Sequence, residues 1–287
     1  MINLWYSNGF WTQSDGRYTG PQIVVKNLIE ALKQENIPYS VNENKYDRNF
    51  IIQYDHTGHE LHKTLDPKTC IIGPQIWPFD SYGKYLMENP NTFHKIIVPS
   101  DWVTNLFTDK FNLDKTKVSV WSVGIPPRQS NLEKIYDCLI YFKRRPKEQI
   151  DSLVKLLREH GLTYKVVSYG SYEQSTFEQW IAQSKFCFLL NGTESQGIAV
   201  QEILAYNIPM LVWDIDSWVD MGEEYKIPAT SIPYWDFRCG EKFYTYDDIV
   251  KNFDYFYANL ANYKPKEYVE ENLSYSKSIL NLLSIFQ

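Results

Sequence analysis

The sequence lacks the features that mark several common protein classes. It has no apolar run of the roughly twenty residues that a membrane-spanning helix needs. Its opening stretch has no basic segment followed by a long apolar core, so we expect no signal peptide. The four cysteines are widely spaced and form neither a CxxC pair nor a Cys/His cluster, which argues against a disulfide framework and a zinc site. We therefore expect buried free thiols in a cytoplasmic protein.

Positive charge is also scarce. The chain has 29 Lys and Arg residues against 35 Asp and Glu residues, a net charge of −6, which disfavours a broad nucleic-acid-binding surface.

A nicotinamide-dependent dehydrogenase is disfavoured as well, because Gly9, Gly16 and Gly20 do not form GxGxxG after the first strand-like segment. Aromatic residues are abundant at 16%, and packing accounts for most of them.

Short apolar segments alternate with amphipathic ones along most of the chain. Strand-like segments of the first half are 2–6, 50–54, 69–73 and 95–100, and helical ones are 21–34 and 100–111. The pattern restarts near residue 136 and ends in an aromatic-rich helical region from Tyr246 onward. Such alternation predicts an α/β protein with parallel sheets covered on both faces. We expect two Rossmann-like, doubly wound domains across a cleft, 1–126 and 127–265, followed by a C-terminal helix over 266–287.

The stretch "NGTESQGIAVQEILAYNIPMLVWD" contains two carboxylates, Glu194 and Glu202, around the expected start of a helix. Ligands bind beyond the carboxyl ends of parallel strands, and a helix N-terminus favours an anion. Gly197 would let a phosphate approach, so Glu202 is positioned to accept hydrogen bonds from a ribose and Glu194 from a sugar. Spacing alone leaves equally open that both are solvated charges, one of them favourable to the helix dipole.

Glu194-x7-Glu202 and the strand after it resemble the EX7E motif of retaining glycosyltransferases of the GT-B fold, family 4. Further matches follow the same order along roughly residues 1–220. They are a glycine loop at Gly20 in which Pro21 replaces a second glycine, His56 after a strand, a Ser-Glu-Trp-like helix start with Asp101 for the glutamate, and the basic triplet Lys143, Arg144, Arg145. The resemblance implies that the triplet holds a diphosphate, a task suited to guanidinium groups.

The same resemblance implies a retaining transfer from a UDP- or GDP-sugar to a glycan or other hydroxyl acceptor. The catalytic candidates are Glu194, His56, Arg144 and Lys143. The donor-binding candidates are Gly20, Ser195, Gln196, Gly197, Ile198, Ala199, Glu202 and Arg145. The N-terminal domain would carry the acceptor, with Trp11, Trp77 and Tyr82 as weaker candidates that ordinary packing also explains. The terminal helix would pack back on that domain.

We expect neither a cofactor nor a metal. The DxD at Asp214 and Asp216 is similar to a metal-binding motif of the other glycosyltransferase fold, but it follows a strand here and fits a hydrogen-bonding role better. A second hypothesis is a catalytically inactive GT-B relative that binds a nucleotide or glycan. Pro21 and Asp101, where the family pattern has glycine and glutamate, favour that alternative.

Overall fold

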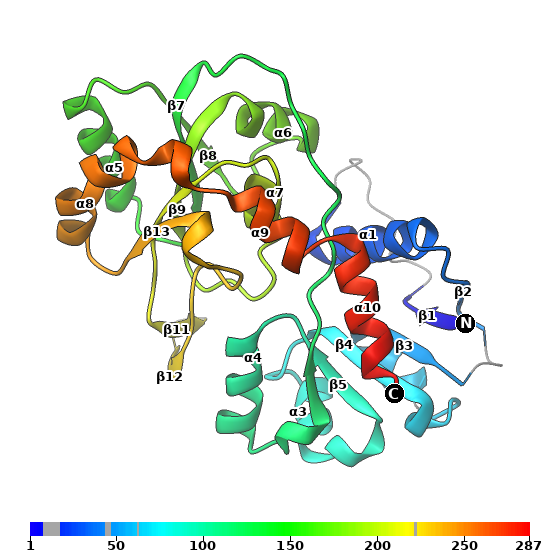
Figure 1. Cartoon of the computed structure of the whole chain (residues 1–287). Coiled ribbons are helices and arrows are strands. Elements are labelled where there is room, and N and C mark those ends of the chain that lie inside the picture. Colours follow the sequence, from blue (N-terminus) through cyan, green and yellow to red (C-terminus); the bar gives the residue numbers. More distant parts are fainter. Residues whose placement is uncertain (8–17, 44–46, 62, 221–222) are drawn as a thin grey trace. The chain divides into compact units, whose positions relative to one another are not determined.

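The structure is a computed structural model that describes residues 1–7, 18–43, 47–61, 63–220 and 223–287 (Figure 1). These residues form two compact units. The first unit consists of residues 1–124 and 275–287, and the second unit of residues 125–274. Each unit contains a parallel sheet with helices, so the predicted α/β fold class is confirmed.

The first unit is built on six parallel strands in the order β2-β1-β3-β4-β5-β6. They are β1 (Ile2–Trp5), β2 (Tyr39–Val41), β3 (Asn49–Tyr54), β4 (Cys70–Ile76), β5 (Lys95–Val98) and β6 (Val118–Val120). The chain moves from β1 to β2 on one side and then returns to β3 on the other side of β1. Open parallel sheets bind ligands at such a reversal, beyond the carboxyl ends of the strands.

Two helices of the first unit, α1 and α3, begin at a residue whose side chain caps the helix. Its α-helices are α1 (Gly20–Gln34), α2 (His56–Leu61), α3 (Ser81–Glu88), α4 (Asp101–Asn105) and α10 (Tyr275–Ile285). Thr19 and Gln22 form a capping box at α1, because the Thr19 hydroxyl accepts from the Gln22 N–H and the Gln22 side chain accepts from the Thr19 N–H. The helix expected over 100–111 is α4, followed by a π-helical turn at Leu106–Lys110.

The C-terminal region divides between the units. Where the sequence predicts one helix over 266–287, the structure has α9 (Pro265–Asn272) in the second unit and α10 in the first. α9 packs against α7 (Ile198–Ala205), and α10 packs against α1. The chain therefore completes the second unit before its last helix returns to the first.

The second unit repeats the topology with five parallel strands in the order β13-β10-β9-β7-β8 (Figure 1). They are β7 (Tyr136–Lys143), β8 (Tyr164–Ser168), β9 (Ser184–Asn191), β10 (Met210–Trp213) and β13 (Gly240–Phe243). β8 lies on one side of β7 and β9 on the other, so the strand order reverses between β7 and β9. This reversal determines where a ligand site of the unit belongs.

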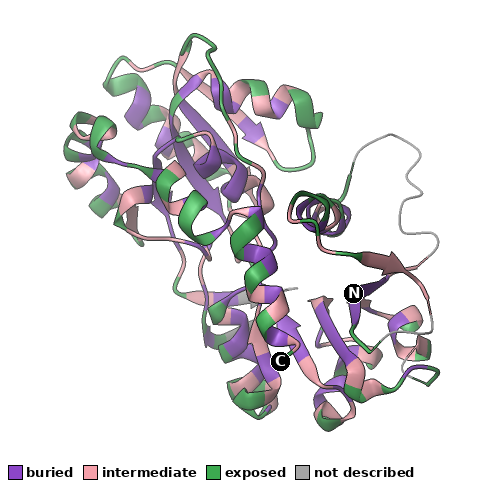
Figure 2. Cartoon of the chain, turned by 45° about the vertical axis from the view of Figure 1, so that its right-hand side comes forward, coloured by how far each residue is buried: buried purple, intermediate pink, exposed green. Residues whose placement is uncertain are grey.

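Helices cover both faces of this sheet. Successive side chains of a strand point to opposite faces, so apolar residues at adjacent positions need cover on both. The remaining helices are α5 (Glu148–Glu159), α6 (Gln174–Ala182) and α8 (Tyr246–Ala258). Leu139 and Cys187 pack with residues of α6 and α7, whereas Ile140 and Phe188 pack with residues of α5 and α8. Figure 2 shows the central strands β7, β9 and β10 as mostly buried. Across the described part of the chain, no helix combines the length and the apolar composition needed to cross a membrane.

One element of the second unit escapes the sequence pattern. β11 (Ser217–Asp220) and β12 (Glu223–Pro228) form an antiparallel hairpin between β10 and β13. Figure 1 shows this hairpin projecting away from the five-stranded sheet. The hairpin starts shortly after β10, and the chain returns to the same place after β12. Residues just before and just after the hairpin, such as Asp214 and Thr230, therefore meet beyond the end of β10.

Gly240→Ala is expected to destabilise the second unit by about 4 kcal/mol or more, beyond the range of an ordinary substitution. Gly240 has φ +132°, and a Cβ there would lie 2.0 Å from the carbonyl oxygen of Met210 on the paired strand. Gly170 is the matched control, with φ +78° and nothing within 4 Å of its Cβ position, so Gly170→Ala should cost only about 1–2 kcal/mol of backbone strain. Amide hydrogen exchange in the strands of the second unit compares the two variants, and equal losses of protection would contradict the steric account.

Candidate functional site

The reversal point of the second unit lies where β7 and β9 end side by side. Lys143 closes β7, Asn191 closes β9, and the two are paired in register. The Gly192 N–H donates to the Lys143 carbonyl oxygen at 2.7 Å. A Cβ on Gly192 would lie 2.9 Å from the carbonyl oxygen of Arg144, so a side chain there would force the two loops apart.

The carboxamide of Asn191 is buried at this point. Its residue is 0% exposed, and neither its side-chain oxygen nor its nitrogen has a hydrogen-bond partner among the described residues. A buried carboxamide without partners is costly, and such groups are rare in folded proteins. The end of β9 thus carries polar atoms that the fold itself does not use.

Lys143 and Glu194 form the central ion pair of the site. Lys143 Nζ lies 2.5 Å from Glu194 Oε2, and the two side chains are 16% and 12% exposed. The ammonium also lies 4.5 Å from the ring centroid of Tyr169, just after β8, which is an attractive cation–π contact. The sequence predicts both members of the pair as site residues, and the structure brings them into direct contact.

Residues 194–197 lead into α7 and are held by a segment after the hairpin. The Glu194 N–H donates to Thr230 O at 3.1 Å, and Gln196 Nε2 donates to the Tyr234 hydroxyl at 3.1 Å. Gly197 adopts φ +62° as the N-cap of α7. The first-turn amides of Ile198 and Ala199 have no acceptor within the helix, as at any helix start. This turn therefore offers N–H groups next to the ion pair.

Glu202 lies on α7 at 5% exposure, within a polar cluster. Its Oε1 accepts from Gln174 Nε2 at 2.9 Å and lies 3.7 Å from Arg128 Nη2. Arg128 also pairs with Glu178 of α6 at 3.0 Å and contacts the ring of Tyr206. Neither Arg128 nor Gln174 belongs to a motif, so the sequence alone does not indicate them. A buried carboxylate needs such partners, so Glu202 is not a solvated charge.

The other two residues of the basic triplet differ in their surroundings. Arg144 is exposed and has φ +54°. Arg145 is half-buried, and its Nη1 donates to Asn191 O and Trp213 O, both at 3.3 Å, while its Nε donates to Gln149. Burial lowers the pKa of Arg145 below its ordinary value, although Asp214 opposes that shift. Arg145 therefore ties the ends of β9 and β10 together, and Ser195 lies exposed in the loop beside them.

Asp214, at the end of β10, is used entirely as a hydrogen-bond acceptor. It is 2% exposed and accepts from the hydroxyls of Thr230 and Ser231 and from the backbone N–H of Ser231 and Ile215. Lys242 Nζ lies 3.3 Å from its Oδ2. The hydrogen-bonding role expected for this residue is confirmed. No three His, Cys, Asp or Glu side chains of the described ranges cluster as metal ligands would.

The candidates of the first unit lie beyond the ends of β3 and β4. His56 opens α2, and its ring contacts Tyr82 of α3 at 6.0 Å between centroids. His59, which belongs to no motif in the sequence, contacts the same tyrosine, with 5.5 Å between the ring centroids. Trp77 is 40% exposed, and its carbonyl oxygen lies 1.9 Å from where a Cβ on Gly83 would stand. The backbone after β4 thus packs closely on α3.

Gly20 begins α1, next to the end of β4. Gln75 Nε2 donates to Pro21 O at 3.0 Å and links β4 to the first turn of α1. No described atom lies within 4 Å of a Cβ position on Gly20, so the surroundings do not demand glycine there. Trp11 lies outside the described residues.

The cysteines provide no nucleophile. All four are free and buried, as predicted. Burial raises the pKa of Cys70 to about 11 and that of Cys239 to about 12, and it raises the pKa of Cys138 and Cys187 as well. These thiols are protonated at neutral pH, whereas a nucleophilic cysteine needs the thiolate.

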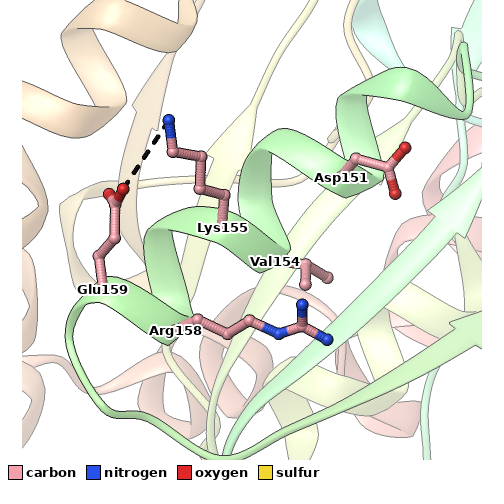
Figure 3. Close-up of a pocket in the computed structure, with 5 residues that line it drawn as sticks. All are labelled: Asp151, Val154, Lys155, Arg158 and Glu159. Carbon is pink, nitrogen blue, oxygen red and sulfur yellow. Dashed lines mark ion pairs between the residues drawn. The ribbon is translucent and has the colours of Figure 1, made fainter.

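A shallow hollow of about 370 Å³ lies on α5 (Figure 3). Its lining residues are Asp151, Val154, Lys155, Arg158 and Glu159. Lys155 and Glu159 form an exposed ion pair across one helical turn. None of the candidate site residues lines this hollow, so it is separate from the site at the end of β7.

Comparison with known proteins supports the fold. No protein-family model and no curated protein matches the sequence. The structure is similar to a mutant of S. aureus TarM in complex with fondaparinux, α-GlcNAc-glycerol and UDP, at TM-score 0.54 and 13% identity over 93% of this chain and 59% of that one. It is also similar to the pneumococcal O-GlcNAc transferase GtfA in complex with UDP and GlcNAc, at 0.52 and 14% over 94% and 60%.

A third similar structure is the lipopolysaccharide outer core galactosyltransferase WaaB, at TM-score 0.59 and 11% identity over 99% of this chain and 98% of that one. The chain spans about three-fifths of the length of TarM and GtfA and nearly all of WaaB. Identities this low show the fold alone. The chain has the GT-B glycosyltransferase fold, as its sequence resemblance predicts, with two Rossmann-like units.

Proposed function

We propose that the chain is a retaining glycosyltransferase of the family 4 type that uses a nucleotide-diphosphate sugar. The observation that carries the proposal is the Lys143–Glu194 ion pair, located at the strand-order reversal and beside the first turn of α7. An ammonium and helix-start amides suit a diphosphate, and the adjacent carboxylate suits sugar hydroxyls. UDP in the complexes of TarM and GtfA supports a UDP-sugar as the first donor to test.

The candidate residues act on different parts of the substrates. Lys143, Arg144, the backbone amides of residues 195–199 and the Gly20 loop neutralise the diphosphate. Glu202 accepts from the ribose, and Glu194 and His56 position the sugar. The bond from the anomeric carbon to the diphosphate breaks, the acceptor oxygen forms the new bond, and its proton leaves with the diphosphate. Catalysis then depends on positioning and on stabilising the leaving group. Trp77, Tyr82 and Trp11 are the proposed acceptor contacts.

The experiment that tests the function screens UDP-, GDP-, ADP- and dTDP-sugars by thermal shift and then follows transfer. A donor at a hundred times its Kd stabilises the folded chain by about 2.7 kcal/mol, which raises Tm measurably. Retention predicts that the product keeps the anomeric configuration of the donor, read by NMR. Added EDTA should leave the rate unchanged, because we propose no metal. An inverted product would contradict the mechanism, and binding without turnover would favour the inactive relative.

Glu202→Ala is expected to weaken nucleotide binding about 10- to 100-fold, because a hydrogen bond to a charged group contributes about 1.5–3 kcal/mol. Glu178→Ala is the matched control, since Glu178 pairs with the same Arg128 but lies on α6. It should change the Kd less than threefold. Calorimetric titration with UDP measures both, and equal losses in the two variants would assign Glu202 a role in the ion-pair cluster only.

A further inference from the structure

Asp214 joins two segments that the hairpin separates in sequence. Its Oδ1 accepts from Ser231 N at 2.7 Å and from Ser231 Oγ at 2.9 Å, and both of its oxygens lie 2.9 Å from Thr230 Oγ1. Thr230 follows Asp214 by sixteen positions, and the hairpin β11–β12 occupies the interval. The buried carboxylate therefore closes the base of the hairpin.

The segment that Asp214 holds is joined to the loop before α7 by two hydrogen bonds. Thr230 O accepts from Glu194 N, and the Tyr234 hydroxyl accepts from Gln196 Nε2. The ring of Pro233 lies 3.7 Å from a Cβ position on Gly197. A continuous set of contacts thus runs from the Asp214 carboxylate through Thr230 to the backbone of Glu194.

We propose that Asp214 is a positioning residue, which holds Thr230 and Ser231 in place and fixes Glu194 against Lys143 through Thr230. The inference rests on the proposed function, in which Glu194 holds the donor sugar, and it assigns the DxD-like aspartate a role that needs no metal. Charge-assisted hydrogen bonds are stronger than neutral ones, so a buried carboxylate with several donors is a rigid anchor. A small displacement of a group that orients the reacting sugar lowers turnover steeply.

Thr230→Val tests the inference with little change in volume, since it removes the hydroxyl that bonds Asp214 and the backbone of Ile232 and keeps the Ser231 contacts. We expect amide exchange of residues 193–197 to rise at least tenfold and turnover to fall about 10- to 100-fold. The Kd for UDP should stay within twofold, because Glu202 is held separately by Gln174 and Arg128. Thr230→Ser should restore both properties. Asp214→Asn, which keeps one oxygen acceptor, should raise the same exchange.

The matched control is Thr163→Val. Thr163 Oγ1 donates to Asp137 Oδ2 at 2.7 Å, a bond of the same kind before the start of β8 in the same unit. This variant should leave exchange over 193–197 and turnover unchanged. The inference is overturned if Thr230→Val leaves that exchange at its wild-type value, or if exchange rises equally throughout the second unit. Failure of the proposed function appears separately, as a wild-type chain that neither binds a nucleotide sugar nor transfers from it.

Discussion

Lys143→Ala is expected to lower turnover of the proposed transfer by about 10²- to 10³-fold, the loss typical when one preorganised charge stabiliser is removed. The lysine ends a buried strand, is 16% exposed and has its ammonium 2.5 Å from Glu194. In a partly dry site, each charge acts more strongly than in water. The substitution removes the cation proposed to face the leaving diphosphate and also ends the ion pair that orients Glu194. The turnover number under saturating donor measures the effect.

Lys155→Ala is the control for this substitution. Lys155 also belongs to the second unit and pairs with a glutamate, but its side chain is 75% exposed and the pair is 3.8 Å apart (Figure 3). Exposed pairs contribute little, so turnover should stay within twofold. Lys143→Arg should restore turnover only in part, because a planar guanidinium does not replace a compact ammonium. Turnover of Lys143→Ala within threefold of wild type would remove this residue from the mechanism.

The sequence predicts Lys143 and Glu194 as site residues, but it does not predict the ion pair between them. Each residue follows or closes a buried apolar run, and parallel strands bring their carboxyl ends to one edge of a sheet. What the pattern does not contain is strand order. That β9 pairs with β7 and not with β8 determines that these two loops meet, and no local feature of either strand encodes it.

The partners of Glu202 and Asp214 are harder to predict. Gln174 and Thr230 are ordinary polar residues at the start of a helix and after a hairpin, and they lie 28 and 16 positions from the carboxylates that they contact. Hydrophobic periodicity identifies strands and helices, but it carries no signal for a side-chain hydrogen bond between distant loops. The sequence can therefore indicate a buried acid, whereas its partners become visible only in the folded chain.

The terminal region shows the same limit for helices. Apolar spacing predicts helical structure over 266–287, yet the chain ends α9 at Asn272 and starts α10 at Tyr275. The two helices then belong to different units. The spacing of apolar residues shows which face of a helix is buried. It does not show which part of the protein that face packs against, because any apolar surface of matching shape can bury it.

Leu282→Ala is expected to destabilise the first unit by about 2–5 kcal/mol, the range for a buried leucine truncated to alanine. Leu282 is 0% exposed on α10, and the same helix bonds to β6 and the residues after it. Trp121 Nε1 donates to Ser278 O, Ser278 Oγ donates to Ser122 O, and Asn281 Nδ2 donates to Val120 O. A cavity at this buried position weakens the packing of α10 in the first unit.

Leu280→Ala separates burial from helix propensity. Leu280 lies on the same helix at 66% exposure, so its truncation should change stability by less than about 0.5 kcal/mol. Amide exchange resolved by strand is the suitable measurement, because global unfolding of two units need not be two-state. With Leu282→Ala, exchange should accelerate in β1, β3 and β6 while β7 and β9 keep wild-type protection. If α10 belongs to the core of the first unit alone, its truncation should lower protection from amide exchange in that unit first. Equal acceleration of exchange in β7 and β9 would show that α10 also stabilises the second unit.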